Sequence, residues 1–251
     1  MNDLISTFHR LENNFFSMIS LNQIDCGNLT AFASGVPAAN LNPAIVHHID
    51  ELFSRSLDSC NIFYEQPKLP WALLLPEYLD NENVRKLLQN HSLTPNDKGV
   101  AMVISFNDDS FSSMKTTLTI KIMENDLQTW SIPLLYGFES TPEITEIYTA
   151  RHQSASMKNQ GLYHFSGFVN DTVVSSLSLS CLDGYARIDD VSTMPAEQKK
   201  GYATQLICAA LKYALSLNIN TCFLEASSSG LGVYKRIGFE ELFINHYYES
   251  Q

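Results

Sequence analysis

Length, composition and charge already exclude several classes of protein. The chain has 251 residues, of which 45% are hydrophobic and 17% charged, so a packed core is expected and global disorder is not. The formal net charge of -11 argues against nucleic acid as the main partner, because phosphate binding needs clustered Lys and Arg.

Targeting and metal-binding signals are missing from the sequence. No early basic segment precedes an apolar run, and no apolar stretch is long enough to span a membrane. The 5 cysteines are odd in number and lack C-x-x-C spacing, as expected for an intracellular protein with reduced thiols. No metal motif is present. We therefore expect a cytoplasmic protein with no metal and no membrane partner.

Residues 1–112 are predicted to form an N-terminal α/β region. A helix is predicted where apolar residues recur at spacings of three and four, at Leu4, Phe8, Leu11 and Phe15. A turn at 33–37 and a second helical pattern across 45–53 follow. An apolar segment at 67–76, a helix at 81–90 and a short strand at 100–106 complete the region. The aromatic side chains of Phe63, Tyr64 and Trp71 fit either a pocket wall or, more commonly, a core.

Residues 113–251 are predicted to form a second unit that begins with a strand at 118–122. Pro142 opens a helix that extends to about residue 157, with Thr141 as its N-cap. Two strands at 163–168 and 172–180 are joined by Asn170 and Asp171, which suit a hairpin turn. Another strand follows at 187–193.

The rest of this unit alternates helices and strands. Apolar residues fall on one face of a helix at 201–218. A strand at 221–226, a short helix at 233–237 that Gly238 ends, and a strand at 239–248 follow. The order β-α-β-β-β-α-β-α-β predicts an α+β (α/β-type) fold with a mixed sheet.

The loop before the long helix has the features of an anion site. The backbone N–H groups that begin a helix have no partner within it and lie at the positive end of its dipole. Gly201 allows close approach of a ligand, and Lys199 and Lys200 add positive charge. The alternative is an ordinary strand–loop–helix connection with a solvated lysine pair.

Two motifs in this region resemble a known family. The first, Gln198-x-x-Gly201-x-Ala203, is similar to the Q/R-x-x-G-x-G/A signature of the GCN5-related N-acetyltransferases, the GNAT superfamily. Gln and Ala stand here where Arg and Gly are usual, and the signature permits both. The second, Tyr234-x-x-x-Gly238-Phe239, resembles the family's last helix and its ending. The resemblance extends from about residue 114 to residue 251.

The resemblance implies a GNAT-like mixed, mostly antiparallel central sheet flanked by helices. The layout of residues 1–112 is compatible with a degenerate GNAT-like half, as in two-halved bacterial GNAT proteins, and the alternative is an unrelated extension. A homodimer is compatible with the sequence.

The implied activity is acetyl transfer from acetyl-CoA, the co-substrate, to a primary amine. The acceptor is an unidentified small molecule or peptide, and its amine is expected to attack directly in a ternary complex. The alternative is a catalytically inactive coenzyme A-binding module or sensor, because the general base is not settled by the motifs. Kinase and dehydrogenase phosphate loops are not found.

The resemblance also assigns candidate site residues. Tyr234 is the expected general acid, with a core tyrosine as the alternative, and Glu225 and Asp190 are candidate bases. Asp189 and Asp190 should point to opposite faces of a regular strand. The predicted coenzyme-binding residues are Val191, Ser192, Thr193, Gln198, Lys199, Lys200, Gly201, Tyr202, Ala203, Thr204, Ser227 and Tyr234. The histidines are expected in loops or at the surface: His47, His48, His152 and His164.

Overall fold

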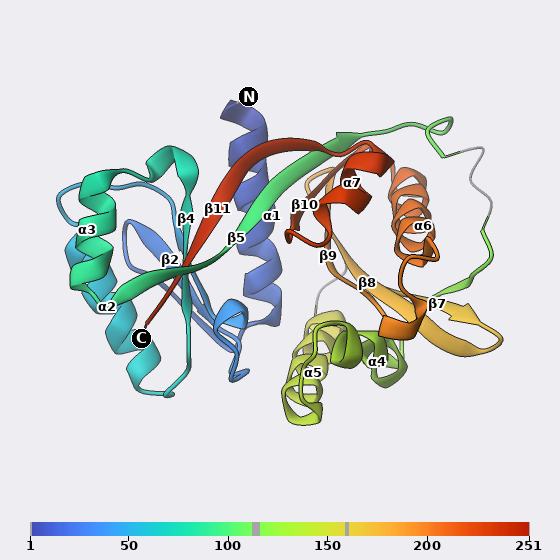
Figure 1. Ribbon diagram of the computed structural model, residues 1–251, viewed down its shortest axis with the longest axis horizontal. Coiled ribbons are helices and arrows are strands. Elements are labelled where there is room, and N and C mark those ends of the chain that lie inside the picture. The colour runs from blue at the N-terminus through green and yellow to red at the C-terminus, as the bar shows by residue number, and fades with distance from the viewer. Residues whose placement is uncertain (1, 112–115, 159–160, 251) are drawn as a thin grey trace.

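The computed structural model describes residues 2–111, 116–158 and 161–250 of the chain. Within these ranges the strands form one sheet of 11 strands, in the order β1-β2-β3-β4-β11-β5-β10-β9-β8-β7-β6. The predicted fold class, a mixed and mostly antiparallel sheet flanked by helices, is confirmed (Figure 1). The predicted division between residues 112 and 113 lies outside the described residues and stays a prediction.

The elements alternate along both parts of the chain. The strands are β1 (Asn22–Asp25), β2 (Leu29–Ala33), β3 (Pro43–Val46), β4 (Ala72–Pro76), β5 (Leu93–Ser105), β6 (Thr119–Ile122), β7 (Leu162–Val169), β8 (Thr172–Leu182), β9 (Tyr185–Thr193), β10 (Thr221–Ala226) and β11 (Glu240–Ser250). The α-helices are α1 (Asn2–Ile19), α2 (Phe53–Glu65), α3 (Glu82–Asn90), α4 (Leu127–Gly137), α5 (Pro142–Lys158), α6 (Tyr202–Ser216) and α7 (Leu231–Ile237). Short 3-10 helices are η1 (Ala39–Leu41), η2 (Glu77–Leu79) and η3 (Pro195–Glu197).

The two parts of the chain repeat one topology. In the first part β3 and β4 are parallel and are connected through α2, and α3 leads into β5. In the second part β9 and β10 are parallel and are connected through α6, and α7 leads into β11. The remaining strand pairs in the described residues are antiparallel. The first part therefore repeats the plan of the second, and its assignment as a degenerate GNAT-like half stays a prediction.

The final strands of the two parts are exchanged. β11, from the second part, pairs with β4 and β5 of the first, and β5 pairs with β10 of the second. Figure 1 shows β5 and β11 running together between the two parts, with α1 beside them. Neither half of the sheet is complete without a strand from the other.

Apolar cores lie on both faces of the sheet in the second part. On one face α6 packs against β7, β8 and β9, and Leu206, Leu211 and Ile188 share a buried cluster. On the other face Phe8 of α1 contacts the rings of Phe223 and Phe243, at centroid distances of 6.5 and 5.2 Å. No helix in the described ranges is both long and apolar enough to span a membrane.

Several elements follow the sequence prediction. α1, α3, α5, α6, α7 and β10 form where expected, and Ile144 N–H donates to the predicted cap, Thr141 Oγ1, at 3.2 Å. The turn between β7 and β8 has positive φ angles at Asn170 (47°) and Asp171 (61°), as a tight hairpin requires. Gly238 ends α7 with a φ of 114°.

Other elements differ from the sequence prediction or were missed by it. Ile45 belongs to strand β3 and not to a helix, because a short buried apolar run has no periodicity that separates the two structures. β5 begins at Leu93, well before the predicted strand, since pairing with β11 extends it through exposed polar residues. Helix α4 was not predicted; it is apolar on most sides, contains Pro133 and is capped by Asp126, whose Oδ1 accepts from Thr129 N–H at 3.0 Å.

Candidate functional site

The two parallel strands of the second part separate partway along their length. β9 and β10 pair only from Ala186 to Ile188 on one strand and from Cys222 to Leu224 on the other. β9 then continues beside β8 as far as Thr193. A gap between the strands therefore opens beyond Ile188, at the level of Asp189 and Glu225.

A β-bulge lies at the mouth of this gap. Asp189 pairs with Ser178 and Ser192 with Ser176, so Asp190 and Val191 together oppose one residue of β8. Asp190 has a φ of 58°, which is unusual for a residue other than glycine. The extra residue of a bulge is left out of the strand ladder, so backbone groups here are free to meet a ligand.

Side chains of α5 and β8 hold the bulge in place. The Asp190 carboxylate accepts hydrogen bonds from Tyr148 Oη at 2.7 Å and Ser178 Oγ at 2.5 Å. Burial raises the pKa of Asp190, and these hydrogen bonds oppose the rise. Because the carboxylate is used by two donors, it is suited to fixing the strand's shape.

The expected loop or surface role of two histidines was wrong. His152 and His164 are buried, and His152 Nδ1 lies 2.8 Å from His164 Nε2. Burial lowers the pKa of His152 to about 3 and that of His164 to about 2, so both are neutral. His152 Nε2 lies 3.6 Å from Asp190 Oδ2. The sequence holds no sign of this contact, because His152 lies alone in a helix and His164 lies alone in a strand.

The bulge also changes the faces of the two aspartates. Asp189 accepts from Arg187, whose guanidinium lies 5.0 Å from the ring of Phe8 in α1, whereas Asp190 bonds to Tyr148 of α5. α1 and α5 contact each other. Both carboxylates therefore lie on one face, because the bulge makes the strand irregular and the alternation expected of a regular strand does not apply.

The loop before α6 has the geometry of an anion site. Gly201 is the N-cap of α6 with a φ of 81°, and Lys199 has a φ of 64°. A Cβ at Gly201 would meet nothing within 4 Å, so there is room for a ligand. The N–H groups of Tyr202, Ala203 and Thr204 begin the helix and have no helical partner. This helix start is therefore a candidate site for an anion.

Other predicted coenzyme residues have side chains that shape the loop and the strand. Gln198 Nε2 donates to Thr193 O at 3.3 Å, and Lys200 pairs with Glu197 at 2.8 Å. Ser192 Oγ donates to the carbonyl of Pro133 in α4 at 2.6 Å. The Ser192 side chain is thus already hydrogen-bonded to the protein. At this position the backbone of β9, and not the side chain, can contact a ligand.

Tyr234 is positioned by the short helix α7 and is 8% exposed. Its ring packs against Phe239 at a centroid distance of 5.9 Å. Its hydroxyl makes no hydrogen bond to the described part of the chain. Burial, and to a lesser degree the charge of Asp189, raises the pKa of Tyr234. Ser227, also predicted to bind coenzyme, lies at the start of α7, where its Oγ accepts from Gly230 N–H at 3.3 Å.

Glu225 lies near the end of β10 and reaches across the neighbouring strand. Its carboxylate accepts from Asn245 Nδ2 at 2.5 Å and from the hydroxyl of Tyr247, both on β11. The intervening residue on β5 is Gly99, where a Cβ would lie 2.2 Å from Glu225 Oε1. Burial, then the charge of Glu12, raises the pKa of Glu225 to about 7.

Sequence reasoning missed two charged residues of this centre. Arg187 is buried, and its Nε lies 3.0 Å from both carboxylate oxygens of Asp189. Glu12 is 1% exposed and lies on α1, with Oε2 3.2 Å from His9 Nδ1. Two signals in the sequence could have found these residues. Arg187 and Asp189 are spaced so that they share one face of a strand, and Glu12 is a lone acid on the apolar face of α1.

The aromatic residues considered for a pocket wall belong to the core of the first part. Tyr64 and Trp71 are buried and stack with their ring centroids 5.1 Å apart. The hydroxyl of Tyr64 donates to the carbonyl of Pro43 at 2.9 Å. Their alternative assignment, core packing, is the one that the structure supports.

Comparison with known proteins gives the family and the fold. Residues 125–239 match the family model described as the Acetyltransferase (GNAT) family. The fold is similar to a GCN5-related N-acetyltransferase from Kribbella flavida, with a TM-score of 0.70, 11% identity, and coverage of 97% of this chain and 95% of that one. No curated protein matches the sequence.

Two further solved structures have the same plan. One is a GCN5-related N-acetyltransferase from Sphaerobacter thermophilus, with a TM-score of 0.66, 12% identity, and coverage of 89% of this chain and 76% of that one. The other is a tandem GNAT protein from the clavulanic acid biosynthesis pathway, with a TM-score of 0.62, 12% identity, and coverage of 88% and 78%. Residues 125–239 thus resemble the GNAT acetyltransferase family, and the two-part fold is similar to that of a tandem GNAT protein.

Proposed function

We propose that the protein is an acetyl-CoA-dependent N-acetyltransferase that acetylates a primary amine by direct attack in a ternary complex. The observation that carries the proposal is the gap between β9 and β10, which opens between an anion-binding helix start and the buried hydroxyl of Tyr234. This combination provides a place for a phosphorylated acyl carrier and a proton donor beside its acyl end.

The coenzyme is held mainly by backbone groups. Its pyrophosphate lies against the N–H groups of residues 202–204, where the dipole of α6 and the charge of Lys199 favour an anion. Its pantetheine arm follows the free edge of β9 from Val191 to Thr193. The bulge at Asp190 directs a backbone N–H toward the thioester carbonyl, where it stabilises the developing oxyanion.

Tyr234 supplies the proton for the leaving group. The amine nitrogen attacks the thioester carbonyl carbon, a C–N bond forms, and the C–S bond then breaks with its electron pair on sulfur. The raised pKa of Tyr234 keeps its hydroxyl protonated at neutral pH, so it can donate to the thiolate.

Glu225 accepts the proton that the amine loses. Its pKa of about 7 places it near the operating pH, as an effective general base requires. Asp190 is the weaker candidate, because Tyr148 and Ser178 already use its oxygens. We assign Asp190 the role of fixing the bulge and so of positioning the backbone near the carbonyl.

Thiol release from acetyl-CoA, measured over a panel of amines, tests the proposal. We expect release that depends on both the protein and a primary amine, with one acetylated amine formed for each thiol. If acetyl-CoA binds but no amine in the panel accelerates thiol release above the rate of hydrolysis, the proposed function is wrong.

A further inference from the structure

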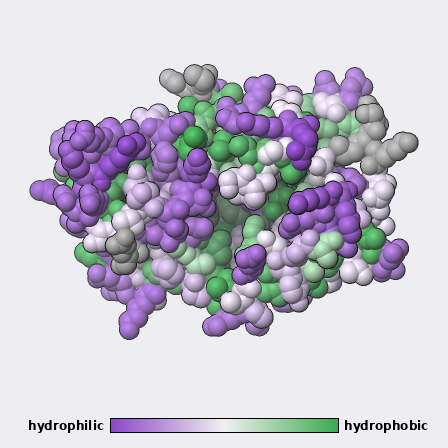
Figure 2. Space-filling model, viewed as in Figure 1, coloured by the Kyte–Doolittle hydropathy of each residue, from purple (hydrophilic) through white to green (hydrophobic). Residues whose placement is uncertain are grey.

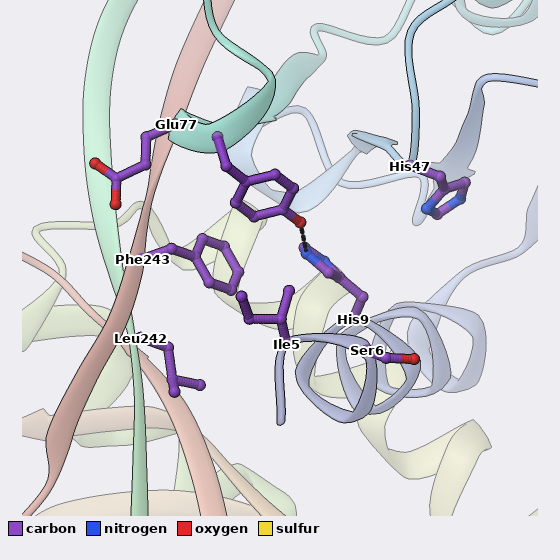
Figure 3. Close-up of a pocket in the computed structure, with 8 residues that line it drawn as sticks. Ile5, Ser6, His9, His47, Glu77, Leu242 and Phe243 are labelled. Atoms are coloured by element: carbon purple, nitrogen blue, oxygen red, sulfur yellow. Dashed lines mark hydrogen bonds between the residues drawn. The ribbon is translucent and has the colours of Figure 1, made fainter. Parts of the chain in front are cut away.

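A pocket of about 610 Å³ lies in the first part of the chain, on the side where α1 covers the sheet. Its walls come from α1, from the residues that follow β3 and β4, and from the start of β11. Its volume is in the range of small-molecule sites. The whole face in Figure 2 shows a central hollow with hydrophobic side chains between two hydrophilic areas, and Figure 3 shows the pocket itself.

The pocket combines one carboxylate with apolar and aromatic walls. Glu77 is the carboxylate among its lining residues, and Ile244 N–H fixes it by donating to Oε1 at 3.0 Å. Ile5, Leu242 and Phe243 supply apolar surface. In Figure 3, Glu77 lies at the left beside the strands, with its carboxylate directed away from the other labelled side chains, and His47 lies at the right. Desolvation lowers the pKa of His47, which disfavours a positive charge on that side of the pocket.

A hydrogen-bonded chain leads from the pocket toward the candidate active site. Tyr78 Oη lies 2.6 Å from His9 Nε2, and His9 Nδ1 lies 3.2 Å from Glu12 Oε2 (Figure 3 marks the first contact). Glu12 is buried and its charge acts on Glu225. A second carboxylate therefore lies directly behind the wall that His9 forms.

The strand register places the pocket close to Glu225. Phe243 on β11 pairs with Ala101 on β5, which pairs with Glu225 on β10. Two strand spacings separate Phe243 from Glu225, or roughly 10 Å. The ring of Phe8 contacts both Phe243 and Phe223, and Phe223 lies two residues before Glu225 on the same strand face. The pocket and the Glu225 carboxylate are thus neighbours on one face of the sheet.

We propose that this pocket binds the acceptor and that the acceptor is a linear diamine or polyamine. One ammonium lies against Glu77, the methylene chain lies along Ile5, Leu242 and Phe243, and the reactive amine points toward Glu12 and Glu225. Glu77 among the lining residues, the apolar surface of the pocket and the buried Glu12 behind His9 match the charge pattern of an α,ω-diamine. The inference rests on the proposed function, because it assigns the acceptor of that same reaction.

Matched amines test the charge at the far end. Acetylation rates are compared for 1,5-diaminopentane and n-pentylamine, which differ only in the second ammonium, and for diamines of three to six carbons. We expect kcat/KM for the best diamine to exceed that for its monoamine by about tenfold or more, as loss of one charged contact would cause. Glu77→Gln keeps the acceptor for Ile244 N–H and should remove most of this preference, while exposed Glu65→Gln on α2 should keep it.

A binding measurement separates the pocket from the chemistry. Calorimetric titration of the full chain with the same diamine should show binding that Ser6→Trp, which fills the pocket from the exposed side of α1, abolishes. Ser59→Trp on the exposed face of α2 is the matched control. Equal rates for diamine and monoamine, or diamine binding that persists in Ser6→Trp, would overturn the proposal. If the diamine binds in the pocket but no amine is acetylated, the proposed function fails and so does the role of the pocket as its acceptor site.

Discussion

The proposed acid, Tyr234, and the proposed base, Glu225, have opposite requirements, and burial suits both. Burial raises the pKa of each group. For the phenol, this keeps the proton available for the leaving thiolate. For the carboxylate, it brings the pKa from its ordinary value of 4.5 to about 7, where proton transfer from an amine is effective.

Replacement of Tyr234 by Phe tests the acid. The ring and its contact with Phe239 are kept, and only the hydroxyl is lost. We expect kcat and kcat/KM to fall together by roughly 10²-fold or more, as for loss of a general acid. The free energy of unfolding should change by about 1 kcal/mol or less. An unchanged rate, under conditions where chemistry limits turnover, would make Tyr234 a packing residue.

The pH dependence of kcat/KM tests the base. Because Glu225 must be ionised to accept a proton, the rate should rise with pH through about 7, and Glu225→Gln should remove this rise and lower the rate. The groups that set its pKa are Glu12, Tyr247, Asn245 and Arg187, so their variants should shift the inflection. A wild-type profile that Glu225→Gln leaves unaltered would rule out this base.

The same ionisation affects stability with a definite sign. The pKa of Glu225 in the folded protein, about 7, exceeds its ordinary value of 4.5. Its contribution to stability is therefore fully present below about pH 4.5 and is lost as the pH rises through 7. Urea unfolding at pH 5 and pH 8 should show a smaller loss of stability for Glu225→Gln than for the wild-type chain. An equal loss in both proteins would mean that Glu225 does not cause it.

At the residue scale, motifs predicted part of the site and could not predict the rest. Gly201 and Tyr234 lie within short motifs, so their positions were readable from spacing. Glu12 and Arg187 come from a distant helix and from the start of a strand, and only folding brings them beside Glu225. The left-handed conformation of Asp190 depends on Tyr148 and Ser178, which local sequence does not specify.

Among single elements, the start of α6 is the feature that we propose to bind the coenzyme. Gly201→Asp should place an anion where the pyrophosphate lies and weaken acetyl-CoA binding by at least roughly tenfold, measured by calorimetry. Gly184→Asp is the matched control, because Gly184 has a similar φ of 79° and equally open surroundings in the turn between β8 and β9. Equal affinities in the two variants would show that α6 does not bind the pyrophosphate.

Helices and strands with clear signals in their own sequence were predicted, and those whose form depends on distant residues were not. The β7–β8 hairpin and α6 carry turn residues and periodic apolar positions, and both were predicted. Helix α4 lacks a clear polar face, because Ile132 and Tyr136 stand on its exposed side, so periodicity could not find it. The length of β5 comes from pairing with β11, which lies more than 100 residues later in the chain.

At the scale of the whole molecule, strand exchange ties the second part to the first. β5 fills the position between β10 and β11, and α1 covers Phe223 and Phe243. The sequence predicted both strands but not their partners, because a strand's pattern gives its faces and leaves its neighbours open. The two-part plan could therefore be predicted from the family resemblance, while the exchange could not.

Expression of a fragment tests whether the second part depends on β5 and α1 of the first part. A fragment of residues 116–251 lacks β5 and α1, so its sheet is interrupted and an apolar face is exposed. We expect it to aggregate or to lack acetyl-CoA binding when expressed alone, and to recover binding when residues 1–111 are co-expressed. A soluble, folded fragment that binds acetyl-CoA with the affinity of the full chain would contradict this expectation.

We propose above all that the protein transfers an acetyl group directly from sulfur to nitrogen in the gap between β9 and β10. Carbon-13 NMR with carbonyl-labelled acetyl-CoA, the full chain and an accepted amine follows the label through the reaction. We predict that the thioester carbonyl signal is replaced by an amide signal of the acetylated amine, and that Tyr234→Phe slows this replacement. A label that remains in the thioester, or that appears only as free acetate whatever amine is present, would contradict the account.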